Sequence, residues 1–240
     1  ACAGGQMKVV KHLLKMMGIQ VNKANKHSAT ALYFACQVGR VAVVKVLIAR
    51  KEIQINQADD GGLTPLFVTC QNGHVDVVRL LMARKDIQIN QAEKSGATPL
   101  FVTCQKGHVD VVRLLLARKE IQINQAGGEG TTPLSVTCQE GHVGVVRLLL
   151  ARKEIQINQA NGEGTTPLSV TCHKGHVDVV RLLLARKEIQ VNQMDGGGST
   201  PLFVTCQNGH VDVVRLLMAR KDIQINQAEK SGATPLFVTC

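Results

Sequence analysis

Residues 64–81 have the sequence TPLFVTCQNGHVDVVRLL, which contains the signals for two short helices joined by a tight turn. Thr64 is an N-cap candidate, and Pro65 suits the first helical position because the N–H that it lacks has no helical partner there. Gly73 ends this first helix as a C-cap. His74 opens a second helix, in which apolar residues recur at helical spacing (Val75, Val78, Leu81 and Met82).

The residues after the second helix predict a connection and a turn. Arg84 and Lys85 lie in or just after the last helical turn, where cations complement the helix dipole. Apolar and polar residues alternate over 87–90 (Ile-Gln-Ile-Asn), which predicts a short extended stretch. Residues 92–96 form a turn before the next Thr-Pro pair. A helix pair this short cannot bury its apolar faces alone, so copies of it must stack.

The same pattern recurs every 34 residues along the chain. The eight cysteines share this spacing (Cys2, Cys36, Cys70, Cys104, Cys138, Cys172, Cys206 and Cys240). We predict one array over residues 1–240, with full repeats at 30–63, 64–97, 98–131, 132–165, 166–199 and 200–233. Residues 1–29 are then the rear part of an earlier repeat, and residues 234–240 the front part of a later one. Repeats 64–97 and 200–233 are identical.

The repeat resembles the ankyrin repeat. The resemblance rests on Thr64-Pro65-Leu66, Gly73-His74, Val77-Val78 with Leu80-Leu81, and Asn90 before a tip that contains glycine. It covers essentially the whole chain and implies an all-α ankyrin-repeat solenoid of stacked helix-turn-helix units with short β-hairpin-like tips. Three features depart from the family. The period is 34 residues instead of about 33, residues 83–87 replace the usual Gly-Ala-Asp after the second helix, and Phe67 replaces the usual histidine. The resemblance also implies a structural role for His74 and its equivalents, and a turn-bonding role for Asn90.

The composition narrows the function classes. The chain has 240 residues, of which 45% are hydrophobic and 2% aromatic, so a core of Val, Leu, Ile, Ala and Cys is expected and disorder is excluded. The scarcity of aromatic residues argues against binding of single-stranded nucleic acid. No apolar run is long enough to span a membrane. The net charge of +10 adds up over repeats that mix cations and anions. A charged face exposed to solvent explains this net charge most simply. The alternative is a basic stripe that binds an acidic surface.

No residue pattern indicates catalysis or a metal site. Equivalent cysteines of neighbouring repeats are expected to lie beyond disulfide distance, so each is predicted to be a small buried thiol. Free thiols favour a reducing compartment, and we expect an intracellular, cytoplasmic location. The Cys70 and His74 pair recurs in five repeats, whereas catalysis needs one specialised site. Histidines one repeat apart cannot converge on one ion. We therefore predict no enzyme activity, no cofactor, no metal and no small-molecule substrate.

Most positions keep the same residue in nearly every repeat, so the exceptions are informative. The hairpin tips and the ends of the first helices vary, and in ankyrin repeats these parts form the concave face that binds partners. The candidate partner-binding residues are Asp59, Asp60, Phe67, Asn72, Glu93, Lys94, Phe101, Lys106, Glu129, Glu140, Asn161, Glu163, His173, Lys174, Asp195, Asn208, Glu229 and Lys230. The alternative is that loop tips simply tolerate change.

These observations lead to a protein-interaction scaffold without chemistry of its own as the first function hypothesis. The second hypothesis is a structural spacer or elastic solenoid, in which the near-identical repeats provide length and elasticity. A targeting module for a domain outside this segment is the third. The expected partners are another protein and further repeats of the same chain at both ends, because neither end carries a polar capping repeat. Nucleic acid is not an expected partner.

Overall fold

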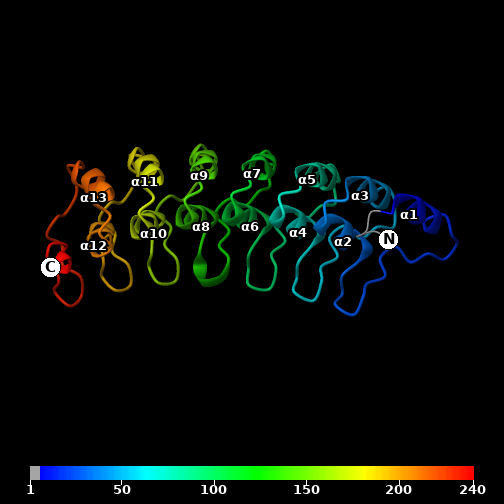
Figure 1. Cartoon of the computed structure of the whole chain (residues 1–240), viewed down its shortest axis with the longest axis horizontal. Helices are drawn as coiled ribbons and strands as arrows, with labels where there is room; N and C mark the ends of the chain where they lie inside the picture. The colour runs from blue at the N-terminus through cyan, green and yellow to red at the C-terminus, as the bar shows by residue number, and fades with distance from the viewer. Residues whose placement is uncertain (1–5) are drawn as a thin grey trace. The chain divides into compact units, whose positions relative to one another are not determined.

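The computed structural model describes residues 6–240 (Figure 1). The chain divides into two compact units. The N-terminal unit extends to Gln122 and the C-terminal unit runs from Ile123 to Cys240. The predicted partial repeat 1–29 therefore lies in part outside the described residues, as does Cys2. Over residues 6–240 the secondary structure is helical and contains no strand. The predicted all-α architecture is confirmed.

The N-terminal unit is built from two rows of short helices. The first helices are α2 (Ala31–Gln37), α4 (Pro65–Gln71) and α6 (Pro99–Lys106), and each packs against the next. The second helices are α1 (Met7–Leu13), α3 (Val41–Ile48), α5 (Val75–Met82) and α7 (Val109–Leu116), which form the other row. Each first helix also packs on the second helix that follows it in the chain, so every repeat contributes one helix to each row.

The C-terminal unit repeats this plan. Its first helices are α8 (Pro133–Glu140), α10 (Pro167–Lys174) and α12 (Pro201–Gln207), and its second helices are α9 (Val143–Leu150), α11 (Val177–Leu184) and α13 (Val211–Met218). Two short 3₁₀ segments complete it: η1 (Gly128–Gly130) in a hairpin tip and η2 (Phe237–Thr239) at the end of the chain. The expected helix pairs and hairpin-like tips are thus present within each unit.

The predicted helix boundaries are confirmed by their hydrogen bonds. The Thr64 side chain accepts a hydrogen bond from the backbone N–H of Phe67 at 3.1 Å, and Pro65 occupies the first helical position. Gly73 follows the helix with φ = +70°, a left-handed conformation that glycine adopts without steric cost. His74 is the N-cap of α5. The same threonine cap recurs at every described first helix.

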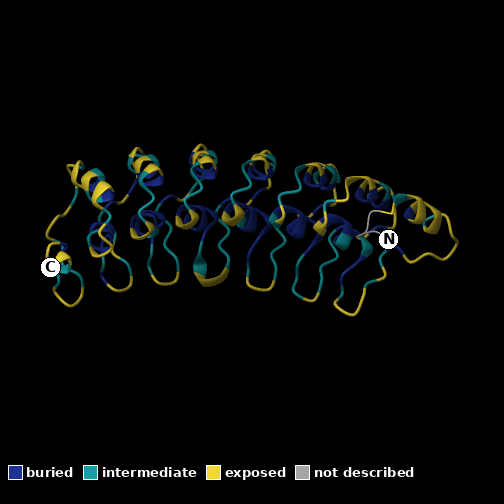
Figure 2. Cartoon of the chain, viewed as in Figure 1, coloured by how far each residue is buried: buried dark blue, intermediate teal, exposed yellow. Residues whose placement is uncertain are grey.

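The core lies between the two rows and between successive repeats, as the dark blue inner faces in Figure 2 show. Leu66 is 1% exposed, and Val77, Val78 and Leu81 are fully buried. Branched aliphatic residues fill most of this space, which agrees with the low aromatic content. The expected packing role of the cysteines is confirmed, since five of the seven described thiols are buried.

The expectation of an extended stretch at 87–90 was wrong. The N–H of Gln91 donates to the carbonyl of Gln88 at 3.3 Å, so the backbone turns here. Ile87 and Ile89 are nevertheless buried, as their alternation with polar residues suggested. A neighbouring repeat holds this turn in place, and a pattern within one repeat does not show such a contact.

Candidate protein-interaction surface

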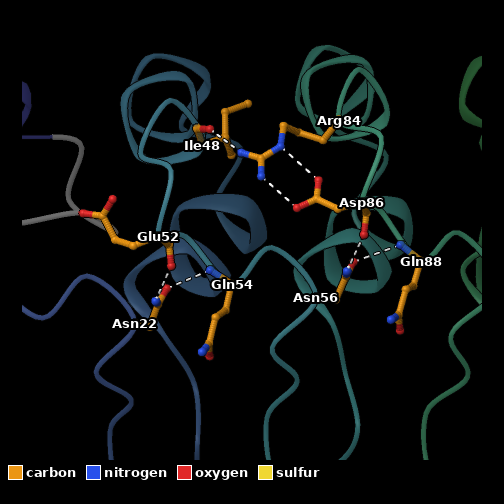
Figure 3. A network of polar contacts seen from close by, with 8 residues as sticks. All are labelled: Asn22, Ile48, Glu52, Gln54, Asn56, Arg84, Asp86 and Gln88. Carbon is orange, nitrogen blue, oxygen red and sulfur yellow. Dashed lines mark hydrogen bonds and ion pairs between the residues drawn. The ribbon is translucent and has the colours of Figure 1, made fainter.

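Asparagine side chains clamp successive repeats together (Figure 3). The Asn56 amide donates through Nδ2 to the carbonyl of Asp86 at 2.7 Å, and its Oδ1 accepts from the N–H of Gln88 at 2.9 Å. Asn22 binds the next repeat in the same way, through Glu52 and Gln54. A role in bonding the turn backbone was expected for these asparagines, and the turn that they bond belongs to the following repeat.

Arginine side chains form a second link between repeats. Nη1 of Arg84 donates to the carbonyl of Ile48 at 2.6 Å, and Nε donates to Oδ1 of Asp86 at 3.0 Å (Figure 3). Ile48 is the last residue of α3, so the guanidinium serves the C-terminus of the preceding second helix. Arg84 lies just after the last turn of α5, as expected, and its guanidinium also bonds the preceding repeat. The hydrogen bond from Arg84 also lowers the pKa of the Asp86 carboxyl.

Histidine side chains form a third link, which agrees with the structural role that the resemblance implied. Nε2 of His74 lies 3.0 Å from the carbonyl oxygen of Gln37 in the preceding repeat. Its ring packs so closely on Gly39 that a Cβ there would lie 2.7 Å from Nδ1. Residues 6–240 contain no group of three or more His, Cys, Asp or Glu side chains placed to hold a metal ion.

The buried cysteines lack the properties of a nucleophile. Burial raises the pKa of the Cys70 thiol to about 12, and a hydrogen bond with Thr103 of the next repeat only partly opposes this. Burial likewise raises the pKa to about 12 for the thiols of Cys36, Cys138 and Cys172. A thiol needs its deprotonated form to react, so these side chains serve as packing groups.

In most tips, the side chain of the first residue forms hydrogen bonds with the backbone of the same tip. Oδ1 of Asp59 accepts hydrogen bonds from the N–H groups of Gly61 and Leu63, both at 2.9 Å. The candidates at the equivalent positions also accept from backbone N–H groups of their own tips (Glu93, Asn161, Asp195 and Glu229). Successive tips are joined by backbone bonds, as from the N–H of Lys94 to the carbonyl of Gly61 at 3.1 Å. These candidates therefore have a structural use.

The candidates on the first helices differ in exposure. Phe67 is only 4% exposed, because its ring packs into the core, so its inclusion among the contact residues is corrected. Phe101 is half-buried. Asn72 and Asn208 are exposed, but each amide donates to the carbonyl four residues earlier in its own helix at 2.7 Å. The Asn208 amide also lies 3.2 Å from Nδ1 of His173 in the preceding repeat.

Two further exposed candidates at the tips also have partners. Asp60 accepts a hydrogen bond from the Ser28 hydroxyl, and the Lys230 ammonium donates to the carbonyl of Gly196. Six exposed charged candidates have no side-chain hydrogen bond or ion pair to any described residue: Lys94 and Lys106 in the N-terminal unit, and Glu129, Glu140, Glu163 and Lys174 in the C-terminal unit. We call these six the unengaged charged residues.

The links between repeats were missed by sequence reasoning, although the sequence carries a signal for them. Asn56, Arg84 and His74 recur at the 34-residue spacing with little change, while neighbouring exposed residues vary. Polar residues that recur in this way, without an apolar environment of their own, indicate bonding between copies. Figure 2 shows the variable tips as the exposed ends of the repeats.

Comparison with known proteins identifies this architecture. A family model described as "Ankyrin repeats (3 copies)" matches residues 1–59, 51–126, 85–161, 119–195 and 154–229. The chain belongs to the ankyrin-repeat family. The crystal structure of the human ASB11 ankyrin repeat domain is similar to it, with a TM-score of 0.72 and 25% sequence identity over 84% of this chain and 88% of that one. No curated protein matches the sequence.

Ankyrin repeats are protein–protein interaction modules, and their fold is known as a non-catalytic interaction scaffold. Among the helices of residues 6–240, none has the length and apolar character needed to cross a membrane. The period of 34 residues fits the repeated helix pairs, so the recognition of the family from its motifs is confirmed.

Proposed function

We propose that this chain is a non-catalytic scaffold that binds a partner protein through its hairpin tips and the adjoining ends of its first helices. One observation carries the proposal: the polar residues of the repeats fall into two sets. The residues that recur in nearly every repeat bond neighbouring repeats, whereas the unengaged charged residues vary and make no such bonds. The second set is free to contact another molecule.

The charges of this second set favour a polar partner surface. Lys106, Glu140 and Lys174 occupy equivalent positions at the ends of α6, α8 and α10, and their charges alternate along the sequence. Complementary charges across an interface select the partner and accelerate its association more than they add affinity. We therefore infer a partner whose contacting charges are complementary to these residues, with binding that weakens as salt rises.

The test compares two variants of equal net charge. The first variant carries Lys106→Ala, Glu140→Ala and Lys174→Ala. The matched control removes two lysines and one acid from exposed positions on the second helices (Lys11→Ala, Lys45→Ala and Asp178→Ala). Partners from lysate of the source organism are captured on the immobilised parent chain and on both variants, and the unfolding midpoint of each is measured.

A partner that binds the parent and the control at physiological salt, and is lost only with the first variant, is the expected result. A partner that binds all three chains equally refutes the proposed surface. The spacer hypothesis remains the alternative, because the bonds between repeats are nearly the same at every junction described within a unit. The spacer hypothesis predicts that these substitutions leave the function unchanged, whereas deletion of one whole repeat alters it.

A further inference from the structure

Two exposed positions carry the same polar residue in every full repeat, although their side chains bond no described residue. Lys85 lies just beyond α5, and Gln88 lies three residues later, on the turn that precedes the tip. Lysine and glutamine stand at this spacing in all full repeats, whereas the exposed tips vary. The links between repeats use asparagine, arginine and histidine side chains, so they do not explain why this lysine and this glutamine recur.

The preceding repeat fixes the backbone at both positions. Asn56 accepts a hydrogen bond from the N–H of Gln88 at 2.9 Å. The same side chain donates to the carbonyl of Asp86, the residue after Lys85, at 2.7 Å. Before Lys85, the Arg84 guanidinium donates to the last carbonyl of α3 at 2.6 Å. The two exposed side chains therefore start from a backbone that is held in a set position relative to the neighbouring repeat.

The turns of successive repeats form one continuous strip within each unit. Each asparagine clamp joins the turn of one repeat to the turn of the next, and the side chains of Gln54 and Gln88 point in the same direction (Figure 3). We call the exposed lysines and glutamines of this strip the Lys-Gln track. In the N-terminal unit the track consists of Lys51, Gln54, Lys85, Gln88, Lys119 and Gln122. The C-terminal unit carries the equivalent residues, with lysines at 153, 187 and 221.

The track carries one uncompensated positive charge per repeat. Each track lysine lies between an arginine and an acid that pair with each other, as Nη2 of Arg84 does with Oδ2 of Asp86 at 2.8 Å. The same ion pair flanks the other track lysines. Neighbouring stacked helices lie about 8–10 Å apart, so the lysines of one unit place a charge at about this interval.

We propose that the Lys-Gln track of each unit binds an extended acidic peptide segment of another protein, in which Asp or Glu recurs at about every third residue. An extended chain rises about 3.3 Å per residue, so three residues span the interval between successive lysines. Each carboxylate of the peptide then pairs with one lysine. The glutamine amides can both donate and accept, so they suit the N–H and carbonyl groups of the peptide backbone.

The glutamines and the paired acids favour a peptide over a nucleic acid or an anionic lipid surface. A phosphate group has only acceptors for these contacts, so it would leave the oxygen of each glutamine amide unpaired. Duplex DNA also carries one charge for about every 1.7 Å of its axis. Such a dense line of charge would meet the exposed acids as well as the lysines, since the Asp86 side chain is 54% exposed. A peptide can place a neutral residue opposite each acid.

The experiment measures binding of a labelled peptide by fluorescence anisotropy at low salt. The spaced peptide has nine residues, with Glu at every third position and Ser or Thr elsewhere. The clustered peptide has the same composition with its three Glu residues adjacent. Duplex DNA and vesicles that contain an anionic phospholipid are the other two probes.

Two charge variants separate the track from net charge. The track variant carries Lys51→Gln, Lys85→Gln, Lys119→Gln, Lys153→Gln, Lys187→Gln and Lys221→Gln. The matched control removes one cation per repeat from the exposed faces of the second helices (Lys45→Gln, Arg79→Gln, Arg113→Gln, Arg147→Gln, Arg181→Gln and Arg215→Gln). All these residues are exposed, so both variants are expected to fold, which circular dichroism checks.

The spaced peptide is expected to bind the parent chain and the control about tenfold more tightly than the track variant, because three weak exposed ion pairs act together. It is also expected to bind the parent more tightly than the clustered peptide does. A third variant, with Gln54→Ala and the equivalent change in the other five full repeats, is expected to bind the spaced peptide more weakly while its affinity for DNA stays unchanged.

Three results would overturn the proposal. Equal binding of the spaced peptide to the parent and the track variant would show that the track is not its site. Equal binding of both peptides to the parent would show that only net charge matters. Track-dependent binding of DNA or vesicles without peptide binding would assign the lysines to phosphate groups. The tips are intact in every variant, and Lys106→Ala, Glu140→Ala and Lys174→Ala are expected to leave peptide binding unchanged, so this test is independent of the proposed scaffold surface.

Discussion

Removal of one asparagine clamp tests whether bonds between repeats stabilise the fold. Asn90 donates to the carbonyl of Glu120 at 2.7 Å and accepts from the N–H of Gln122 at 3.0 Å. Each neutral hydrogen bond contributes about 0.5–1.5 kcal/mol, so Asn90→Ala removes about 1–3 kcal/mol. Both bonds are exposed to water, which places the expected loss near 1.5 kcal/mol, at the lower end of that range.

The chain contains its own control for this substitution. Asn226 lies at the equivalent position of an identical repeat, but no described repeat follows it and its side chain makes no hydrogen bond to a described residue. Asn226→Ala is therefore expected to cost less than about 0.5 kcal/mol, the range of ordinary surface substitutions. The two variants share all local sequence, so propensity and turn effects cancel between them.

Urea unfolding followed by circular dichroism at low protein concentration measures the difference. With a slope of about 3 kcal/mol per molar urea, Asn90→Ala is expected to lower the midpoint by about 0.3–0.5 M relative to Asn226→Ala. Hydrogen exchange at the Gln122 amide is expected to accelerate in Asn90→Ala. Equal midpoints for the two variants would refute the clamp and would favour bonding within the turn of one repeat.

Three further predictions use the same internal comparisons. Gly73→Ala is expected to cost about 1–2 kcal/mol more than Gly209→Ala, because both have positive φ but only Gly73 has a histidine ring 2.8 Å from the added Cβ; equal urea midpoints would contradict this. In a Cys2→Ser background, a thiol reagent is expected to label Cys240 in the native chain, and Cys70 only after unfolding; rapid native labelling of Cys70 would show that its site opens. The arginine bond lowers the pKa of Asp86, so its stabilisation is present above about pH 4 and is lost as the pH falls through the lowered value; Asp86→Asn should therefore weaken the dependence of the urea midpoint on acid pH.

The tips show where variation between repeats is a poor guide to function. Asp59 and Glu93 varied and were therefore candidate contacts, yet both side chains hold the backbone of their own tips. The tip with Gly127 at this position has no such side chain and forms η1 instead, with Glu129 at φ = +58°. The backbone of a tip is thus held by the side chain of its first residue in some repeats and by a 3₁₀ turn in another. This leaves the six unengaged charged residues as the better candidates.

The sequence by itself determined the helix pair, its caps and its repetition. These features depend on contacts within about ten residues, such as the bond between Thr64 and the N–H of Phe67, and on the 34-residue period. It also determined that the cysteines pack instead of pairing, because the repeat spacing keeps them apart.

Only the tertiary structure decided what the recurring polar residues bond to. Asn56 and Gln88 are 32 residues apart, and Arg84 and Ile48 are 36 apart, so no local pattern shows that their atoms meet. Burial likewise depends on a neighbour, since Leu236 and Leu100 share one local sequence and differ completely in exposure. In a stacked array each repeat completes the one before it, so bonding and burial belong to pairs of repeats and not to the sequence of one.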